Sequence, residues 1–429
     1  MIPAFVVLLF ALIGLGLSVA AVLVIVTLFL DHFYSFFPVL PASGEMLWGG
    51  STSFALVAVP LFILTGELLL NSGIAAAMFV AIDRWVRVVP GGLLHTIVGS
   101  SALFAATSGS SVATAATIGT VAVPQMKAGG YSPPLFLGSI AAGGTLGILI
   151  PPSINMIIYG VLADVSIGRL YLAGLIPGLL MALLFSLLIL GVCLWRPEAG
   201  GRSEARPTLR ERFETLPGLL PPLLLFVLMV GSIYLGIATP TEAAALGFLA
   251  ALVLTALRGK LTFGLLMSAF ERTMRTTCMV MLIVLAAQLL NFVMVSVGLA
   301  EQIRMAVGAI DAPPVVILVA IVVIYLVLGC FMETLSLMIA TTPIVVPIIT
   351  AIGYDPLWFG VVFMILIEMA LITPPIGMNL FVVQSVRGEG SFRDVAVGSI
   401  PFVAVMLVMV AILTAFPALA TWLPTFMRG

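Results

Sequence analysis

"LIPPSIN", residues 149–155, interrupts a stretch that carries no charged residue from 128 to 163, and "LITPPIGMN" stands at 371–379. Proline lacks a backbone N–H and clashes with the preceding helical turn, so a pair of prolines breaks a helix. Within a membrane, the carbonyl groups freed by such a break are tolerated only where they face protein or a water-filled cavity. The two sequences therefore predict two broken membrane helices beside an internal cavity.

The composition indicates an integral membrane protein. Of the 429 residues, 62% are hydrophobic and 8% are charged, and the mean hydropathy is +1.30, whereas about a quarter of the residues of soluble proteins are charged. Several uncharged runs exceed the roughly 20 residues that a membrane span needs. The first of these runs covers residues 1–30, where we expect a single membrane helix. Lipid requires backbone groups to pair internally and no regular series of short alternating strands occurs, so we predict an all-α polytopic fold.

The basic residues predict the orientation. Five of the 17 Lys and Arg residues fall between 196 and 212, which marks residues 196–215 as a cytoplasmic linker. Counting outward from this linker places 14 of the 17 basic residues in the cytoplasm and both termini in the periplasm. Each half, 1–195 and 216–429, then crosses the membrane an odd number of times. The two halves are therefore expected to have opposite orientations.

An internal repeat supports this division. Shifting the chain by 223 residues aligns Pro151 and Pro152 with Pro374 and Pro375, and eight of the 29 positions from 124 to 152 are identical. Together with the opposite orientations, the match is typical of inverted-repeat secondary transporters. Chance similarity between apolar sequences is the alternative. Each unit is predicted to contain a re-entrant hairpin and a broken helix, at about 92–125 and 132–163 and again at about 314–347 and 356–386.

The tip of the first predicted hairpin is rich in hydroxyl groups. The segment between the basic residues Arg87 and Lys127 contains "TSGSS" at 107–111, and it is too short for two full crossings of about 20 residues each and a turn. Ser and Thr hydroxyls at such a tip can cap helix ends or join free carbonyl oxygens in a cation site, with Na⁺ as the expected ion. Capping combined with close packing of small residues is the alternative.

The second unit has carboxylates where the first has hydroxyls. Ser110 aligns with Glu333 in "CFMETLS", and Thr145 aligns with Glu368. An ionisable group at membrane depth is costly, so each Glu is a candidate functional residue. The alternative is a protonated or hydrogen-bonded carboxyl that holds two elements together, and the same two possibilities apply to Glu67.

Glu242 has a local explanation. In "TPTEAAALG", Thr239 can be the N-cap of a helix and Pro240 its first residue, with Glu242 completing a capping box. We therefore predict a structural role for Glu242.

Five sequence motifs, taken together, carry a resemblance to a known family: "SGSSVATAATIG", "GGTLGILIPPS", "ATPTEAAALG", "METLSLMIATTPIVVP" and "ITPPIGMNLFV". The chain resembles the large membrane subunit of tripartite ATP-independent periplasmic (TRAP) transporters over essentially its whole length. The resemblance implies a bacterial inner-membrane symporter that is driven by Na⁺ and imports an organic acid. It also implies two partners, a periplasmic binding protein that delivers the acid and a small four-helix membrane subunit. No cofactor is implied, and the hairpins and broken helices would form a moving transport domain of the elevator type.

The resemblance also implies candidate site residues. One Na⁺ site would involve the first tip and the end of the first broken helix, with Ser108, Gly109, Ser110, Ser111, Gly144, Thr145 and Pro151. The other would involve the second tip and the second break, with Met332, Glu333, Thr334, Thr373, Pro374, Gly377 and Met378. The candidate substrate-binding residues are Ser111, Asn155, Thr334, Glu368 and Asn379.

Other classes of protein fit the sequence less well. A two-component dicarboxylate/Na⁺ symporter would share the hairpins and repeats but would need no binding protein. An intramembrane enzyme would be expected to show a catalytic motif such as HExxH, which the sequence lacks. A passive channel would not need two occluding hairpins. We therefore expect a transporter and no enzymatic activity.

Overall fold

The computed structural model describes residues 1–35, 40–201, 207–310 and 312–427, and these residues form helices and no strands. Part of the predicted cytoplasmic linker, residues 202–206, lies outside the described residues. The helices of the first half are α1 (Ile2–Gly14), α2 (Val19–Tyr34), α3 (Leu40–Ser51), α4 (Ala58–Asn71), α5 (Ile74–Val86), α6 (Leu93–Ser108), α7 (Ser111–Ala128), α8 (Pro133–Leu149), α9 (Ile154–Leu162) and α10 (Ile167–Trp195). Those of the second half are α11 (Leu209–Thr215), α12 (Leu220–Phe226), α13 (Ser232–Tyr234), α14 (Pro240–Leu257), α15 (Phe263–Ser296), α16 (Leu299–Gly308), α17 (Pro314–Gly329), α18 (Thr334–Ala351), α19 (Pro356–Ile372), α20 (Met378–Arg387), α21 (Phe392–Ala415) and α22 (Ala418–Phe426).

The long apolar helices confirm a multi-pass membrane protein. Among the described residues, six helices are long and apolar enough to cross a membrane, or up to eight if each of two bent helix pairs counts as one span. The 29-residue α10 exposes Leu179, Leu183 and Leu187, each more than half accessible, along one face. Residues four apart share a helix face, so this leucine stripe is suited to contact with lipid.

The N-terminal segment differs from the sequence expectation. Residues 1–30 were expected to form one helix, but α1 ends at Gly14 and α2 begins at Val19. Gly16, between them, has a φ of 75°, which is incompatible with continued right-handed helix. The glycine and serine content of residues 14–18 therefore overrides the apolar character of the run.

The predicted capping box is confirmed. The Thr239 hydroxyl accepts a hydrogen bond from the Glu242 amide at 3.3 Å, and the Glu242 carboxylate accepts one from the Thr239 amide at 2.7 Å. Pro240 is the first residue of α14. Two backbone amides at the start of α14 are thus hydrogen-bonded by side chains within the same four residues.

Two helices meet at the hydroxyl-rich sequence. The helix α6 ends at Ser108 and α7 begins at Ser111, with Gly109 in the left-handed conformation at a φ of 62°. The Ser110 hydroxyl caps α7 by accepting a hydrogen bond from the Ala113 amide at 3.4 Å. A Cβ on Gly109 would lie 2.8 Å from the carbonyl oxygen of Pro152, so the junction between α6 and α7 contacts the first Pro-Pro pair.

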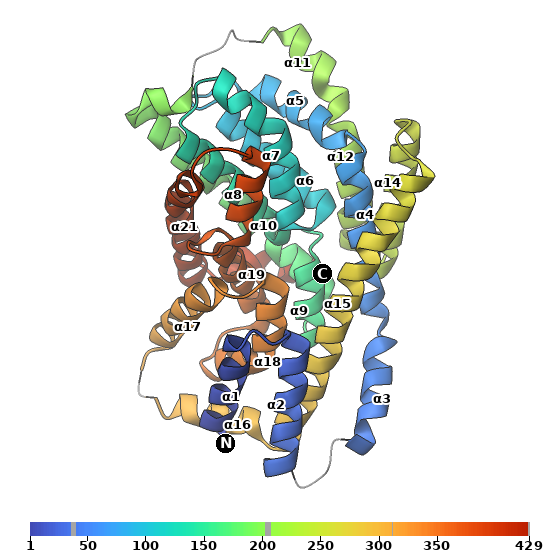
Figure 1. Cartoon of the computed structure of the whole chain (residues 1–429), viewed down its shortest axis with the longest axis vertical. Coiled ribbons are helices and arrows are strands. Elements are labelled where there is room, and N and C mark those ends of the chain that lie inside the picture. The colour runs from blue at the N-terminus through green and yellow to red at the C-terminus, as the bar shows by residue number, and fades with distance from the viewer. Residues whose placement is uncertain (36–39, 202–206, 311, 428–429) are drawn as a thin grey trace.

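The second half contains a similar pair, α17 and α18, which meet at residues 330–333. The Cys330 thiol lies 3.6 Å from the carbonyl oxygen of Pro374, so this junction contacts the second Pro-Pro pair. In Figure 1, α6 and α7 lie toward one end of the molecule's long axis and α17 and α18 toward the other.

Both Pro-Pro sequences end a helix. The helices α8 and α9 are bent by 45° across residues 150–153, and α9 restarts where the Ser153 hydroxyl accepts a hydrogen bond from the Met156 amide at 3.4 Å. The helices α19 and α20 are separated by residues 373–377. The prolines lack the amides that would continue either helix.

The helices before the two breaks form the centre of the fold. From Leu135 to Leu149 every residue of α8 is buried, as is every residue of α19 from Leu357 to Ile372. Very close backbone contact joins α8 to α21, because a Cβ on Gly138 would lie 2.1 Å from the carbonyl oxygen of Gly398. Such dense packing gives the two breaks fixed positions inside the protein.

Candidate functional site

A cavity of about 170 Å³ lies where the two helix junctions approach each other. Its walls come from the ends of α6 and α8, the first turns of α7, α9 and α18, the end of α19, and one face each of α4 and α15. Segments more than 200 residues apart in the sequence therefore share one cavity.

The first junction contributes four residues to this cavity, and all four were candidate site residues: Ser108, Gly109, Ser110 and Ser111. The hydroxyl groups of Ser108 and Thr114 are 3.1 Å apart, and Thr114 donates to the Ser110 carbonyl at 2.8 Å. The hydroxyl-rich sequence thus builds a hydrogen-bonded tip that faces the cavity.

The second junction contributes Glu333 and Thr334. The Glu333 carboxylate accepts hydrogen bonds from the amides of Leu335 at 3.1 Å and Ser336 at 2.9 Å. It is therefore the N-cap of α18, and its charge is favourably placed at the positive end of that helix. Met332, also a candidate, is partly buried beside these residues and does not line the cavity.

Glu368 lies behind the cavity wall. The residue is only 1% exposed, and the Ser111 hydroxyl lies 2.5 Å from its Oε1 and 2.6 Å from its Oε2. Glu368 does not line the cavity, whereas Ser111 does. The contact joins the first helix pair to the second broken helix.

Two buried asparagines follow the two breaks. Asn155, in the first turn of α9, lines the cavity, and its Nδ2 has no hydrogen-bond partner in the described part of the chain. Asn379, in the first turn of α20, donates weakly to the Ala141 carbonyl at 3.4 Å, and its Oδ1 is likewise unpaired among the described residues. Buried amide groups are normally paired, so Asn155 offers a donor that a ligand in the cavity could use.

The remaining candidates lie outside the cavity lining. The Thr145 hydroxyl donates to the Ala142 carbonyl and the Thr373 hydroxyl to the Met369 carbonyl, both at 2.6 Å. Gly144 is close to the first tip, because a Cβ there would lie 3.1 Å from the Ser111 carbonyl oxygen. The other candidates, which belong to the two breaks, are Pro151, Pro374, Gly377 and Met378.

Sequence reasoning singled out Glu67 on α4 but did not identify the other contributions of α4 and α15. Gly66 approaches the first tip so closely that a Cβ would lie 3.2 Å from the Ser108 carbonyl oxygen. Thr276 and Val280 of α15 line another part of the cavity. Glu67 also lines the cavity and lies 3.4 Å from Arg272. Glu67 was recognisable from the sequence because it is charged, whereas the other cavity-lining residues of α4 and α15 are uncharged residues of apolar helices.

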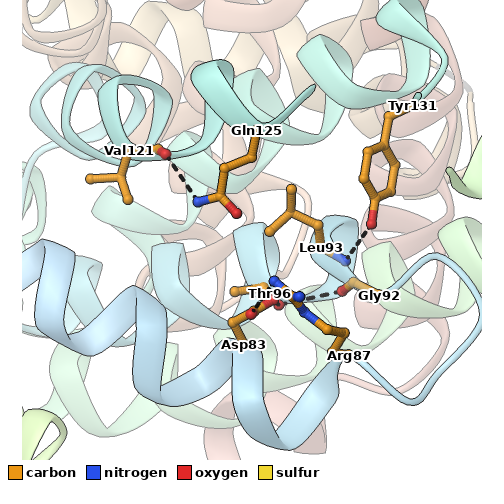
Figure 2. Close-up of polar contacts among 8 residues, drawn as sticks. All are labelled: Asp83, Arg87, Gly92, Leu93, Thr96, Val121, Gln125 and Tyr131. Atoms are coloured by element: carbon orange, nitrogen blue, oxygen red, sulfur yellow. Dashed lines mark hydrogen bonds and ion pairs between the residues drawn. The ribbon is translucent and has the colours of Figure 1, made fainter. Parts of the chain in front are cut away.

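A polar cluster anchors the start of α6 to α5, as Figure 2 shows. Asp83 is 5% exposed, pairs with Arg87 at 2.6 Å and accepts a hydrogen bond from the Thr96 hydroxyl at 3.2 Å. The Leu93 amide donates to the Tyr131 hydroxyl at 3.3 Å. The end of the helix pair opposite the tip is thus held in place by hydrogen bonds.

A cation in this region would be bound mainly by oxygen atoms of backbone and hydroxyl groups. Among the described residues, no three His, Cys, Asp or Glu side chains cluster closely enough to hold a metal ion. Carbonyl and hydroxyl oxygens at the broken and capped helix ends suit a hard cation better than a soft transition metal.

The fold resembles that of a solved transporter. The YdaH transporter of Alcanivorax borkumensis superimposes with a TM-score of 0.68, covering 94% of this chain and 96% of that one, at 16% sequence identity. At this identity the likeness concerns the fold alone.

Sequence comparison identifies closer relatives. The sialic acid TRAP transporter large permease protein SiaM of Vibrio cholerae is 33% identical over 388 residues, 90% of each chain. The C4-dicarboxylate TRAP transporter large permease protein DctM of Pseudomonas aeruginosa is 33% identical over 382 residues, 89% of this chain and 88% of that one. The family described as "Tripartite ATP-independent periplasmic transporter, DctM component" matches residues 6–419. The chain therefore belongs to the DctM family, the large permease components of tripartite ATP-independent periplasmic transporters.

Proposed function

We propose that this permease subunit imports an organic acid by Na⁺ symport, receiving the acid from a periplasmic binding protein and working with a small membrane subunit. The observation that carries the proposal is the convergence of helix ends on one cavity. The first turns of α7, α9 and α18 all contribute to its lining. Helix N-termini carry unpaired amides and a partial positive charge, which favour a carboxylate.

The three N-termini are not equivalent. Glu333 already occupies the amides at the start of α18, and its negative charge offsets the positive end of that helix. The starts of α7 and α9 carry no acidic residue in their first turns. The acid group is therefore expected between α7 and α9, where the unpaired Asn155 amide supplies a further donor.

The first tip is the better-formed candidate for a Na⁺ site. It contacts the end of the first broken helix on two sides, at Pro152 through Gly109 and at Gly147 through Ser110. The Pro152 carbonyl is therefore close to Gly109, and the Ser110 carbonyl is close to α8, which supports an oxygen-lined cation site here. Na⁺ bound here would order the tip that presents the α7 amides to the acid, which would couple the two ligands through differential affinity.

The proposal includes an inverted-repeat architecture with elevator movement. The two helix pairs lie toward opposite ends of the long axis (Figure 1), and each contacts the Pro-Pro pair of its own half. The arms α6 and α7 have 16 and 18 residues, about 24 and 27 Å at 1.5 Å per residue. Both are shorter than the roughly 30 Å hydrocarbon core, which supports re-entrant hairpins.

The substrate class rests on the same chemistry. The names of the relatives cite sialic acid and C4-dicarboxylate, which share a carboxylate and differ in the rest of the molecule. A site that holds the carboxylate by helix amides would serve either. We therefore propose a carboxylate substrate without choosing among acids.

The test is uptake into proteoliposomes that contain the permease with its small subunit and receive the loaded binding protein. We expect uptake to require an inward Na⁺ gradient and to stop when K⁺ replaces Na⁺; equal uptake in K⁺ would contradict Na⁺ coupling. Ser110→Ala should raise the Na⁺ concentration needed for half-maximal uptake. Ser166→Ala is the matched control, because Ser166 also caps a helix, by accepting from the Arg169 amide at 3.5 Å, but lies outside the cavity lining.

A further inference from the structure

Glu368 was a candidate substrate ligand, but its carboxyl group contacts Ser111 and does not line the cavity. We infer that Glu368 is a positioning residue: its carboxyl group holds the first turn of α7 at the cavity through Ser111 and touches neither substrate nor ion. This inference rests on the proposed transport function, since it concerns the helix end that would hold the acid. It changes the role expected for Glu368, which was a candidate for direct substrate binding.

Both partners are buried, but only Ser111 lines the cavity. Glu368 is 1% exposed in the middle of α19 and is absent from the cavity lining, whereas Ser111 is 2% exposed and forms part of it. In the described part of the chain, the Ser111 hydroxyl is the single hydrogen-bond partner of Glu368. Glu368 can therefore influence a ligand in the cavity only through Ser111.

The two short distances indicate that a hydrogen bond, and not a charge, is the useful property of Glu368. Ser111 Oγ is within 2.6 Å of both carboxyl oxygens, but a hydroxyl has only one proton to donate. A neutral carboxyl could supply a second proton, and each group would then donate to the other. A buried carboxylate without a positive partner would also be strongly unfavourable. A carboxamide has a similar shape and offers an acceptor oxygen and an NH₂ group with two donor hydrogens.

Ser111 is a sensitive point at which to hold α7. It is the first residue of the helix, and the amides of the first turn have no acceptor within their own helix. Its carbonyl oxygen packs against α8 at Gly144. A fixed Ser111 thus sets the direction of the amides that face the cavity, and it ties them to a helix of the other half of the chain.

The experiment compares Glu368→Gln, Glu368→Ala, Ser111→Ala and the double alanine variant in the intact complex. Uptake is measured over a range of loaded binding protein, and thermal unfolding is measured on the same preparations. Glu368→Ala should raise the half-saturating concentration about ten-fold, the effect of one lost buried hydrogen bond, and Glu368→Gln should restore it to within about two-fold of wild type. The double variant should be no worse than Ser111→Ala alone.

Three outcomes would overturn the inference. Glu368→Gln could be as defective as Glu368→Ala, which would mean that the charge is needed. The two alanine effects could add, which would mean that the residues act separately. The alanine variants could lower the unfolding midpoint and leave the half-saturating concentration unchanged, which would mean that the contact is only structural. We expect that result for the control Tyr159→Phe, which removes a 2.8 Å hydrogen bond from α9 to the Pro356 carbonyl. Failure of the proposed function is recognised separately, because wild-type uptake would then not depend on Na⁺.

Discussion

Gly147 allows the contact between α8 and the first tip to be tested by adding one methyl group. A Cβ at this position would lie 2.7 Å from the carbonyl carbon and oxygen of Ser110 and 2.8 Å from the amide nitrogen of Ser111. Ordinary contact begins at 3.4 Å, so Gly147→Ala should displace the tip by about 0.7 Å. The atoms in the way belong to the backbone, so no side chain can rotate to make room.

The expected costs follow from this displacement. Overpacking of a dense interior costs about 1 to 3 kcal/mol, and a shift approaching 1 Å in a positioned site can reduce its rate by about 100-fold. We therefore expect Gly147→Ala to lower the thermal midpoint in detergent and to reduce Na⁺-driven uptake at least ten-fold. The loss of uptake should exceed any loss of folded protein.

Gly191→Ala is the matched control. Gly191 is also a helical glycine, in α10, but a Cβ there would have no neighbour within 4 Å. Alanine favours a helix over glycine by about 1 kcal/mol, so this variant should keep or slightly raise the thermal midpoint and transport normally. If Gly147→Ala behaved like Gly191→Ala in both assays, the tip would not be held against α8 as described.

Three other predictions concern separate contacts. Thr239→Ala should destabilise the protein by about 1 kcal/mol through loss of the α14 cap, measured by thermal unfolding, and leave the Na⁺ dependence unchanged. Asn155→Leu should raise the half-saturating concentration of loaded binding protein about ten-fold. An unchanged concentration would show that the Asn155 amide does not bind the acid. The hydrogen bond and charge of Lys127 lower the pKa of Glu389. The pair therefore stabilises the fold at any pH above the ordinary carboxyl pKa, and this stabilisation is lost as the pH falls through the lowered pKa of Glu389. Glu389→Gln should lower the thermal unfolding midpoint at neutral pH but match wild type in acid.

Local features of the chain could be predicted from the sequence. The two Pro-Pro pairs end helices because proline cannot donate the amide that the next turn needs. The Thr239 cap depends on four consecutive residues, and the junction at Gly109 needs a residue that tolerates a left-handed conformation. Each of these outcomes is decided within one helical turn, where composition and backbone chemistry are sufficient.

The assembly of the cavity could not be predicted in the same way. Ser111 and Glu368 are 257 residues apart, and no pattern along either helix indicates that one side chain reaches the other. Gly66 and Thr276 lie on apolar helices whose sequences favour burial but do not indicate which face approaches the tip. Such contacts depend on how all the helices pack together, which a hydrophobic pattern leaves open.

The second tip shows why the type of residue alone does not assign a ligand. An acidic side chain at membrane depth suggests an ion ligand, yet both oxygens of Glu333 accept hydrogen bonds from α18 amides. Each carboxylate oxygen keeps a further lone pair, so a cation could share Glu333 with those amides, but the bonds to the start of α18 draw on the same negative charge. Thr373 is differently placed, because its proton is donated to the Met369 carbonyl and, among the described residues, its oxygen accepts no hydrogen bond. We therefore expect Na⁺ at the second site to be held mainly by neutral oxygens, with Glu333 contributing through the field at the start of α18.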